Sequence, residues 1–271
     1  MGSSLSCFTC SLENKLNSTI FLPPNRPNGI QNGIQNGIQT FESPNCISTI
    51  VLTSSGNIIS IAIITPENTN YSIIKKCIIF CHGNSSDIIQ MIDFMKWLSD
   101  GLNICVIVFD YPGYGNSSGQ PTEQNCYESM ESVVNYVKTD MNISSENIFL
   151  MGQSLGTGIV IDYAYKYKWS SPIILISPYK SICKIAYDSP LLNQIDKFKS
   201  INKIKQINCP IKIFHGEDDT LINISHGKAI YECSNNKLFK PSWLPEIGHN
   251  NILGAIKMAE LLEVVNYNIN D

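Results

Sequence analysis

The hydrophobic positions of this chain form short apolar runs, separated by longer segments in which apolar residues recur every three or four positions. Short runs such as 77–81 are typical of buried strands, and the periodic segments predict helices. The expected strands are 47–53, 58–64, 77–81, 104–109, 148–151, 173–176, 211–214 and 239–244. The expected helices are 87–98, 123–139, 155–167, 225–233 and 252–265.

Strands that alternate with helices indicate an α/β protein with a mainly parallel sheet and helices on both faces. The first two strands differ, because only Ser54-Ser55-Gly56-Asn57 separates them, which predicts an antiparallel hairpin at one edge. This is the layout of the α/β-hydrolase fold. About 34 residues lie between the strands 173–176 and 211–214, where this fold inserts its cap, so we expect a short cap.

The regular pattern begins at Cys46, so we expect residues 46–271 to form one hydrolase domain. A chain of 271 residues with 43% hydrophobic content is sufficient for one sizeable core. Residues 1–45 contain Pro23-Pro24 and a repeated Asn-Gly-Ile-Gln unit over 28–39, with few apolar residues to offset the entropy lost on ordering. We interpret this segment as a flexible tether outside the core.

Charge and composition exclude several classes of protein. Charged residues make up 15% of the chain and the net charge is −4, so we expect no nucleic-acid partner. The single arginine, Arg26, lies outside the predicted domain, which disfavours substrates gripped by a carboxylate or phosphate. No apolar run reaches the roughly 18–20 residues that span a bilayer, and we expect no transmembrane helix and no secretory signal. The spacing of the ten cysteines does not suggest a disulfide framework, which favours a reduced, cytosolic setting.

The candidate chemistry begins with Gly152-Gln153-Ser154-Leu155-Gly156, placed after a predicted strand and before a predicted helix. A serine between two glycines at this spacing is the nucleophile elbow of a serine hydrolase. The turn holds the serine in a strained backbone conformation, and side chains two residues to either side would collide there. We therefore expect Ser154 to be the nucleophile.

A serine nucleophile needs a base and an orienting acid, and in this fold the acid precedes the histidine along the chain. His82 precedes the serine and His215 precedes the acidic cluster, so this order excludes both. His226 follows the acids by one short loop and is interpreted as a capping or packing residue. His249, in a loop after the last strand, is the expected base.

The acid is one of three neighbours. Glu217, Asp218 and Asp219 all follow the strand 211–214, and spacing alone does not choose among them. The oxyanion hole should consist of the Leu155 amide, at the start of its helix, and the Asn84 amide in His82-Gly83-Asn84. Such a site requires no metal and no organic cofactor.

A set of motifs occurs in one order along the chain: Phe80-Cys81-His82-Gly83-Asn84, the run 110–119, Gly152-Gln153-Ser154-Leu155-Gly156-Thr157, His215-Gly216, Ser225-His226-Gly227 and Gly248-His249-Asn250. The set resembles the α/β-hydrolase domain-containing protein 17 family, membrane-attached serine hydrolases that remove palmitate from proteins. The resemblance covers most of the chain, and the family's His-Gly-x-x-Asp pattern implies that Asp219 is the acid. The family carries a dense N-terminal cysteine cluster, whereas this chain has only Cys7 and Cys10 there.

The N-terminus, Met1-Gly2-Ser3-Ser4-Leu5-Ser6, fits the myristoylation pattern with its modified glycine at Gly2. One myristoyl chain gives only marginal membrane binding, and acylation of Cys7 and Cys10 would supply the second signal. Their spacing also suits a redox or zinc site, but no second ligand pair accompanies them. We expect a protein held by N-terminal acyl chains at the cytoplasmic face of membranes.

The sequence thus predicts a monomeric serine hydrolase of acyl thioesters or esters, and the resemblance implies protein S-depalmitoylation. Its substrates would be S-acylated proteins or acyl lipids. Candidates for an acyl groove lie in the short cap, at Tyr187, Leu191 and Leu192. A lipase or esterase, or a serine peptidase, would use the same three residues. A catalytically silent membrane-tethered scaffold has no reason to retain all three in order.

Overall fold

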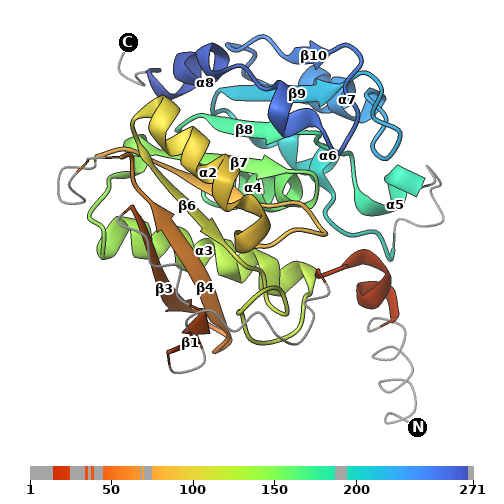
Figure 1. Cartoon of the computed structure of the whole chain (residues 1–271). Helices are drawn as coiled ribbons and strands as arrows, with labels where there is room; N and C mark the ends of the chain where they lie inside the picture. The colour runs from red at the N-terminus through yellow and green to blue at the C-terminus, as the bar shows by residue number, and fades with distance from the viewer. Residues whose placement is uncertain are drawn as a thin grey trace, which may run out of the picture.

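The computed structural model describes residues 15–24, 34–35, 38–39, 45–67, 69, 75–186 and 194–267. Its centre is an eight-stranded sheet with the strand order β10-β9-β8-β7-β5-β6-β4-β3 (Figure 1). The strands are β3 (Cys46–Leu52), β4 (Ile58–Ile64), β5 (Cys77–Cys81), β6 (Cys105–Phe109), β7 (Ile148–Gln153), β8 (Ile173–Ile176), β9 (Ile211–Gly216) and β10 (Ser242–Leu244). Within this sheet only the pairings of β4, with β3 and β6, are antiparallel, so the predicted sheet and its edge hairpin are confirmed.

Helices cover both faces of the sheet. The helices are α2 (Ile88–Leu102), α3 (Glu123–Thr139), α4 (Leu155–Lys166), α5 (Ile182–Ala186), α6 (Ser200–Lys203), α7 (Ser225–Cys233) and α8 (Met258–Val265). Alternate residues of β5 divide between two hydrophobic clusters: Cys77 and Ile79 pack with α3 and α4, whereas Ile78 and Phe80 pack with α2 and α8. This alternation follows from the two-residue period of a strand, and the predicted α/β-hydrolase fold is confirmed.

Most helices have the predicted limits, and the differences have local causes. Asp87 is the N-cap of α2, where its side chain accepts a hydrogen bond from the Gln90 amide at 3.0 Å. The single helix predicted over 252–265 is instead a 3₁₀ turn, Ile252–Ala255, followed by α8, because the chain is extended at Ile256 and Lys257. Short 3₁₀ turns also precede β7 (Ser145–Asn147) and follow α6 (Ile204–Gln206).

The interpretation of residues 1–45 as a tether outside the core was wrong for 15–24. Residues 15–20 form a helix, and Ile20 and Phe21 are buried in the same cluster as α3 and α4. The cause is tertiary, since the Phe21 ring packs edge-on against the Phe198 ring at a centroid distance of 6.1 Å. Within the repeat, β1 (Ile34–Gln35) pairs with β2 (Ile38–Gln39) as antiparallel strands.

The cap connects β8 to β9 over residues 177–210, and its described part contains α5 and α6. The acyl-groove candidates Tyr187, Leu191 and Leu192 lie outside the described residues, as do Gly2, Cys7 and Cys10. Figure 1 shows α5 and the segment 15–24 on the side of the molecule to which the parallel strands point. In the part of the chain that the structure describes, no helix is long and apolar enough to cross a membrane.

Candidate active site

Ser154 stands at the junction between β7 and α4. Its φ of 50° and ψ of −117° lie outside the regions that L-residues adopt easily, so the turn is strained as the motif predicts. A hydrogen bond to the neighbouring strand stabilises this backbone conformation: the Ser154 amide donates to the Ile176 carbonyl of β8 at 2.8 Å. The Ser154 carbonyl accepts from the hydroxyl of Thr157 at 2.7 Å, which fixes the first turn of α4.

The two glycines of the motif are required by close backbone packing. A Cβ atom at Gly152 would lie 2.5 Å from the Gly156 carbonyl oxygen. One at Gly156 would overlap the Cys81 carbonyl oxygen at the end of β5. Any side chain at either position would therefore push the helix away from the sheet and displace Ser154.

His249 lies against Ser154 and joins it to Asp219. Its Nε2 is 3.1 Å from Ser154 Oγ, and its Nδ1 is 2.7 Å from Asp219 Oδ2. Because an ionised carboxylate only accepts hydrogen bonds, Nδ1 carries the proton and Nε2 is the acceptor for the serine hydroxyl. The imidazole is 12% exposed, so it can be reached from the solvent while its Nδ1 side is enclosed.

Asp219 is held by its own loop as well as by His249. Its side chain is fully buried, and Oδ1 accepts the amides of Leu221 at 3.0 Å and Ile222 at 2.7 Å. Burial alone would raise the pKa of Asp219, but the hydrogen bonds from His249 and the Ile222 amide outweigh it and lower the pKa. The carboxyl group is therefore ionised at neutral pH.

Burial distinguishes the three acidic neighbours that spacing could not. The side chains of Glu217 and Asp218 are exposed, and their amides donate to the Leu244 and Ile247 carbonyls at 2.8 and 3.0 Å. These two bonds join the end of β9 to the chain that leads to His249. Asp219 alone of the three points its carboxylate at the histidine.

The other three histidines have structural contacts. His82 Nδ1 is 2.8 Å from the Gly83 carbonyl, and burial lowers the pKa of His82 to about 4, so its ring is neutral. His215 Nε2 is 2.7 Å from the Ile222 carbonyl, and burial lowers its pKa as well. His226 Nδ1 accepts the Lys180 amide at 3.2 Å.

The two predicted oxyanion donors belong to different segments near Ser154. Leu155 is the first residue of α4, and the loop of Asn84 passes beside the serine, since a Cβ atom at Gly83 would lie 3.9 Å from Ser154 Cβ. Within the described residues, neither the Leu155 nor the Asn84 amide donates to a protein acceptor. The first amides of a helix have no partner within it and lie at the positive end of its dipole. Both amides are thus available to a ligand oxygen.

Sequence reasoning missed the side chain of Asn84. Its Nδ2 donates to the Ile20 carbonyl at 2.7 Å, and its Oδ1 accepts from the Leu22 amide at 3.1 Å and from the Tyr114 hydroxyl at 2.7 Å. The sequence held one signal of this docking, because Leu16 and Ile20 are four residues apart and Phe21 follows at once, just before Pro23 ends the helix.

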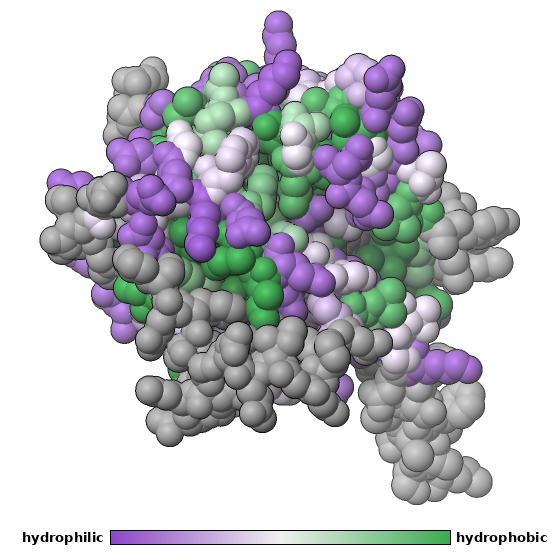
Figure 2. Space-filling model, viewed as in Figure 1, coloured by the Kyte–Doolittle hydropathy of each residue, from purple (hydrophilic) through white to green (hydrophobic). Residues whose placement is uncertain are grey.

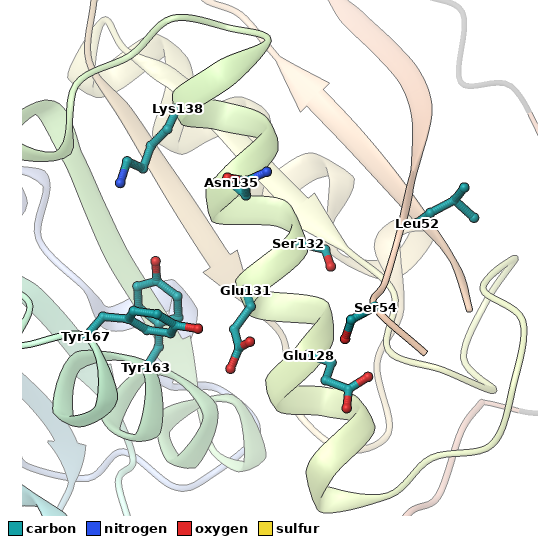
Figure 3. Close-up of a pocket in the computed structure, with 9 residues that line it drawn as sticks. All are labelled: Leu52, Ser54, Glu128, Glu131, Ser132, Asn135, Lys138, Tyr163 and Tyr167. Carbon is teal, nitrogen blue, oxygen red and sulfur yellow. The ribbon is translucent and has the colours of Figure 1, made fainter. Parts of the chain in front are cut away.

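A separate hollow of about 360 Å³ lies along α3, with side chains of α4 on one side and Leu52 and Ser54, at the end of β3, on the other (Figure 3). Glu128 and Glu131 of α3 line it, and so do the rings of Tyr163 and Tyr167, which are tilted against each other at a centroid distance of 4.5 Å. Lys166 pairs with Glu131 at its margin. None of its lining residues is a candidate site residue. Among the described residues, no group of three His, Cys, Asp or Glu side chains is placed to hold a metal ion.

Comparisons with known proteins show what the chain is similar to. A family model described as "Serine aminopeptidase, S33" matches residues 72–200. A protein of Acanthamoeba polyphaga mimivirus named as an alpha/beta hydrolase is 43% identical over 268 residues, which cover 97% of each chain. Human alpha/beta hydrolase domain-containing protein 17C is 38% identical over 65% of this chain, and the matched region covers 53% of that protein, about half its length. The resemblance drawn from the motifs is confirmed.

Solved structures with the same fold include esterases. An esterase from Pyrococcus furiosus superposes with a TM-score of 0.66 at 17% identity and covers 92% of this chain and 100% of its own. Est1E from Butyrivibrio proteoclasticus, solved with ferulic acid, has a TM-score of 0.64 at 16% identity and covers 81% of this chain and 100% of its own. At such identities the likeness shows the fold alone.

Proposed function

The chain belongs to the alpha/beta-hydrolase family, and from this premise we propose that it is a serine hydrolase of acyl thioesters and esters. The observation that carries the proposal is the chain of hydrogen bonds from Ser154 through His249 to Asp219. A serine, a histidine and a buried carboxylate in this order form the group that makes a hydroxyl nucleophilic at neutral pH.

The proposed reaction has two halves. Ser154 Oγ attacks the acyl carbonyl carbon while His249 Nε2 takes its proton, and the protonated imidazole then gives that proton to the departing thiolate or alkoxide. This leaves an acyl ester on Ser154. A water molecule next attacks the ester carbonyl while His249 Nε2 takes one proton of the water. The bond between the carbonyl carbon and Ser154 Oγ then breaks, the imidazolium returns its proton to Ser154 Oγ, and the fatty acid departs as the product. Asp219 keeps its charge throughout and stabilises the imidazolium in both halves.

The Leu155 and Asn84 amides would bind the negative oxygen that develops in each half. Both lie beside Ser154, at the start of α4 and in the loop after β5. Such donors stabilise the transition state more than the ground state, because the carbonyl oxygen gains charge only as the nucleophile adds.

An apolar surface near the site supports acyl chains as substrates. Leu22, bonded through its amide to Asn84, is 54% exposed, and Leu221, bonded through its amide to Asp219, is 59% exposed. Figure 2 shows apolar side chains on the side of the molecule where the segment 15–24 and α5 lie. We propose S-acylated proteins, the substrates that the resemblance implies, with Tyr187, Leu191 and Leu192 of the cap as further acyl contacts. The proposal for membrane action rests on Gly2, Cys7 and Cys10 as acylation sites at the cytoplasmic face.

The test compares the wild type, Ser154→Ala and Ser132→Ala, a serine of α3 that lines the separate hollow. Each is incubated with a fluorescent fluorophosphonate and with three substrates: a palmitoylated peptide, a monoacylglycerol and an aminoacyl amide. We expect labelling and thioester hydrolysis in the wild type and Ser132→Ala, and neither in Ser154→Ala, whose circular dichroism should match the wild type.

The outcomes separate the competing functions. Preference for the monoacylglycerol would make the protein a lipase, and preference for the amide would make it a peptidase, as the description of the matching family model suggests. A folded wild type that neither labels nor hydrolyses would support a scaffold and overturn the proposal.

A further inference from the structure

The Asn84 side chain connects the loop after β5 to two distant segments. Its amide bonds to the backbone at Ile20 and Leu22, more than 60 residues earlier, and to the hydroxyl of Tyr114. All three distances lie between 2.7 and 3.1 Å, which is the range of well-formed hydrogen bonds.

The chemistry of the partners sets the orientation of this amide. The Ile20 carbonyl needs a donor, so it faces Nδ2, and the Leu22 amide needs an acceptor, so it faces Oδ1. Burial raises the pKa of Tyr114 far above its ordinary value, so its hydroxyl stays protonated and donates to the same Oδ1. A flipped or rotated side chain would lose all three bonds.

The segment that holds Asn84 is itself anchored in the core. Ile20 is 8% exposed and Phe21 is 3% exposed, and the Phe21 ring packs against Phe198 of the cap. Phe198 in turn packs edge-on against Tyr127 of α3 at a centroid distance of 5.5 Å. Residues 15–22 therefore bridge the cap and the loop of Asn84.

This loop lies directly beside the nucleophile. Gly83 precedes Asn84, and its position is within van der Waals reach of Gln153 and Ser154. A hydrogen bond to a developing oxyanion works only when the donor is already aimed at it, and a displacement of about 1 Å can cost about a hundredfold in rate. Within the loop, the Gly83 carbonyl is bound by His82 Nδ1 at 2.8 Å and by the Ser86 amide at 3.3 Å. The direction of the next residue, Asn84, then depends on the three hydrogen bonds of its own side chain.

We propose that the Asn84 side chain is a positioning residue, through which the docked segment 15–22 aims the Asn84 amide at the oxyanion. The inference rests on the proposed hydrolase function. It gives residues 15–22 a role in the chemistry, because the Ile20 carbonyl and the Leu22 amide make two of the hydrogen bonds that orient Asn84.

The test measures kcat and KM for a soluble thioester in the full-length chain. Asn84→Ala removes three hydrogen bonds, and we expect kcat to fall about tenfold while KM changes less than about threefold. Tyr114→Phe removes one of the three, and we expect a fall of about threefold. Phe21→Ala loosens the segment without touching Asn84, so kcat should fall, and Phe21→Leu should restore most of it.

Asn235→Ala is the matched control. Its Nδ2 donates to the Lys205 carbonyl at 2.7 Å and to Asn208 Oδ1 at 3.2 Å, before the start of β9 and so at the opposite end of the sheet. It should lower the melting temperature slightly and leave kcat unchanged.

Two results would overturn the inference while the hydrolase function stands. One is an unchanged kcat in Asn84→Ala and Tyr114→Phe, and the other is an equal loss in Asn235→Ala. If Asn84→Ala does not fold, Tyr114→Phe and Phe21→Ala decide by themselves. Absence of Ser154-dependent turnover in the wild type would instead mean that the proposed function is wrong.

Discussion

Asp219 Oδ2 accepts a hydrogen bond from His249 Nδ1 at 2.7 Å, although 29 residues of chain separate the two. The second oxygen of Asp219 is held by the amides of Leu221 and Ile222, so the carboxylate cannot turn away from the imidazole. One residue earlier, Asp218 is exposed. Two adjacent carboxylates therefore have different surroundings, and this difference leads to the first prediction.

Asp219→Asn should lower kcat for a thioester by about 10³–10⁴-fold, because an amide facing Nδ1 favours the wrong tautomer of His249. Asp218→Asn, the matched control, should change kcat by less than about twofold. The measurement is steady-state kinetics at pH 7.5, with circular dichroism to check folding. If Asp218→Asn is the more damaging of the two, the assignment of the acid is wrong.

Gly156→Ala should destabilise the protein by about 3 kcal/mol or more, since the added methyl group would overlap the Cys81 carbonyl where nothing can relax cheaply. Gly254→Ala is the control, because its Cβ would meet no atom within 4 Å, and it should be neutral within about 0.5 kcal/mol. Urea unfolding measures both. Similar midpoints for the two variants would contradict the packing argument for the elbow.

Local pattern was sufficient for most of the fold. The apolar run 58–64 predicted β4, which is buried at every residue but its first. The spacing of apolar residues likewise predicted the limits of α3 and α7. The nucleophile elbow could be predicted because Gly152, Ser154 and Gly156 lie within one turn of the chain. The steric requirement for the two glycines is therefore visible in five consecutive residues. These are the features that the hydrophobic period and a strained turn determine by themselves.

The features that local spacing and composition left open depend on contacts between distant segments. Asp219 differs from Asp218 only in burial, which the loop of Leu221 and Ile222 creates. Phe21 is buried because Phe198, 177 residues later, provides a partner ring. The spacing of Leu16 and Ile20 is the one local sign of this docking, and it does not reveal the partner ring. An interpretation of residues 15–24 from composition therefore treated them as a tether.

Stability should fall as the pH decreases from about 6.5 to 4. In the unfolded chain a histidine takes up a proton near pH 6.5. In the folded chain burial lowers the pKa of His82 to about 4, so the unfolded state binds the extra proton throughout this window. The free energy of unfolding then decreases by up to about 1.4 kcal/mol per pH unit for His82.

Urea titrations at pH 4.5, 5.5, 6.5 and 7.5 measure this slope. The lowered pKa of Asp219 acts only below the ordinary range of an aspartate, so it does not contribute to the same window. His82→Gln keeps a donor for the Gly83 carbonyl. It should reduce the slope of unfolding free energy against pH by up to about 1.4 kcal/mol per pH unit, which corresponds to the uptake of one proton. An identical slope in the wild type and His82→Gln would show that His82 is not the group responsible.

Membrane attachment should depend on the N-terminus. Gly2→Ala, and separately Cys7→Ser with Cys10→Ser, should move the protein from the membrane to the soluble fraction, because one acyl chain alone binds too weakly to persist. The double variant Cys183→Ser with Cys233→Ser, which changes two half-buried cysteines of the domain, should stay on the membrane. Retention of both N-terminal variants would mean that another part of the chain is the anchor. Turnover of a soluble thioester should be unchanged in all of them.

The preference for long acyl chains should depend on the exposed leucines beside the site. Leu221 is 59% exposed and follows Asp219 closely, so a long acyl chain that leaves Ser154 can cover it. Leu221→Asp should therefore lower kcat/KM for a palmitoyl thioester about tenfold and for an acetyl ester less than about twofold. Leu191→Asp and Leu192→Asp, in the cap, should show the same selectivity.

Leu238→Asp is the control, since Leu238 is 53% exposed and lies where Asn236 contacts the chain before β9, away from the site. Equal losses on both substrates in Leu221→Asp would mean that this leucine supports the Asp219 loop and does not contact the acyl chain.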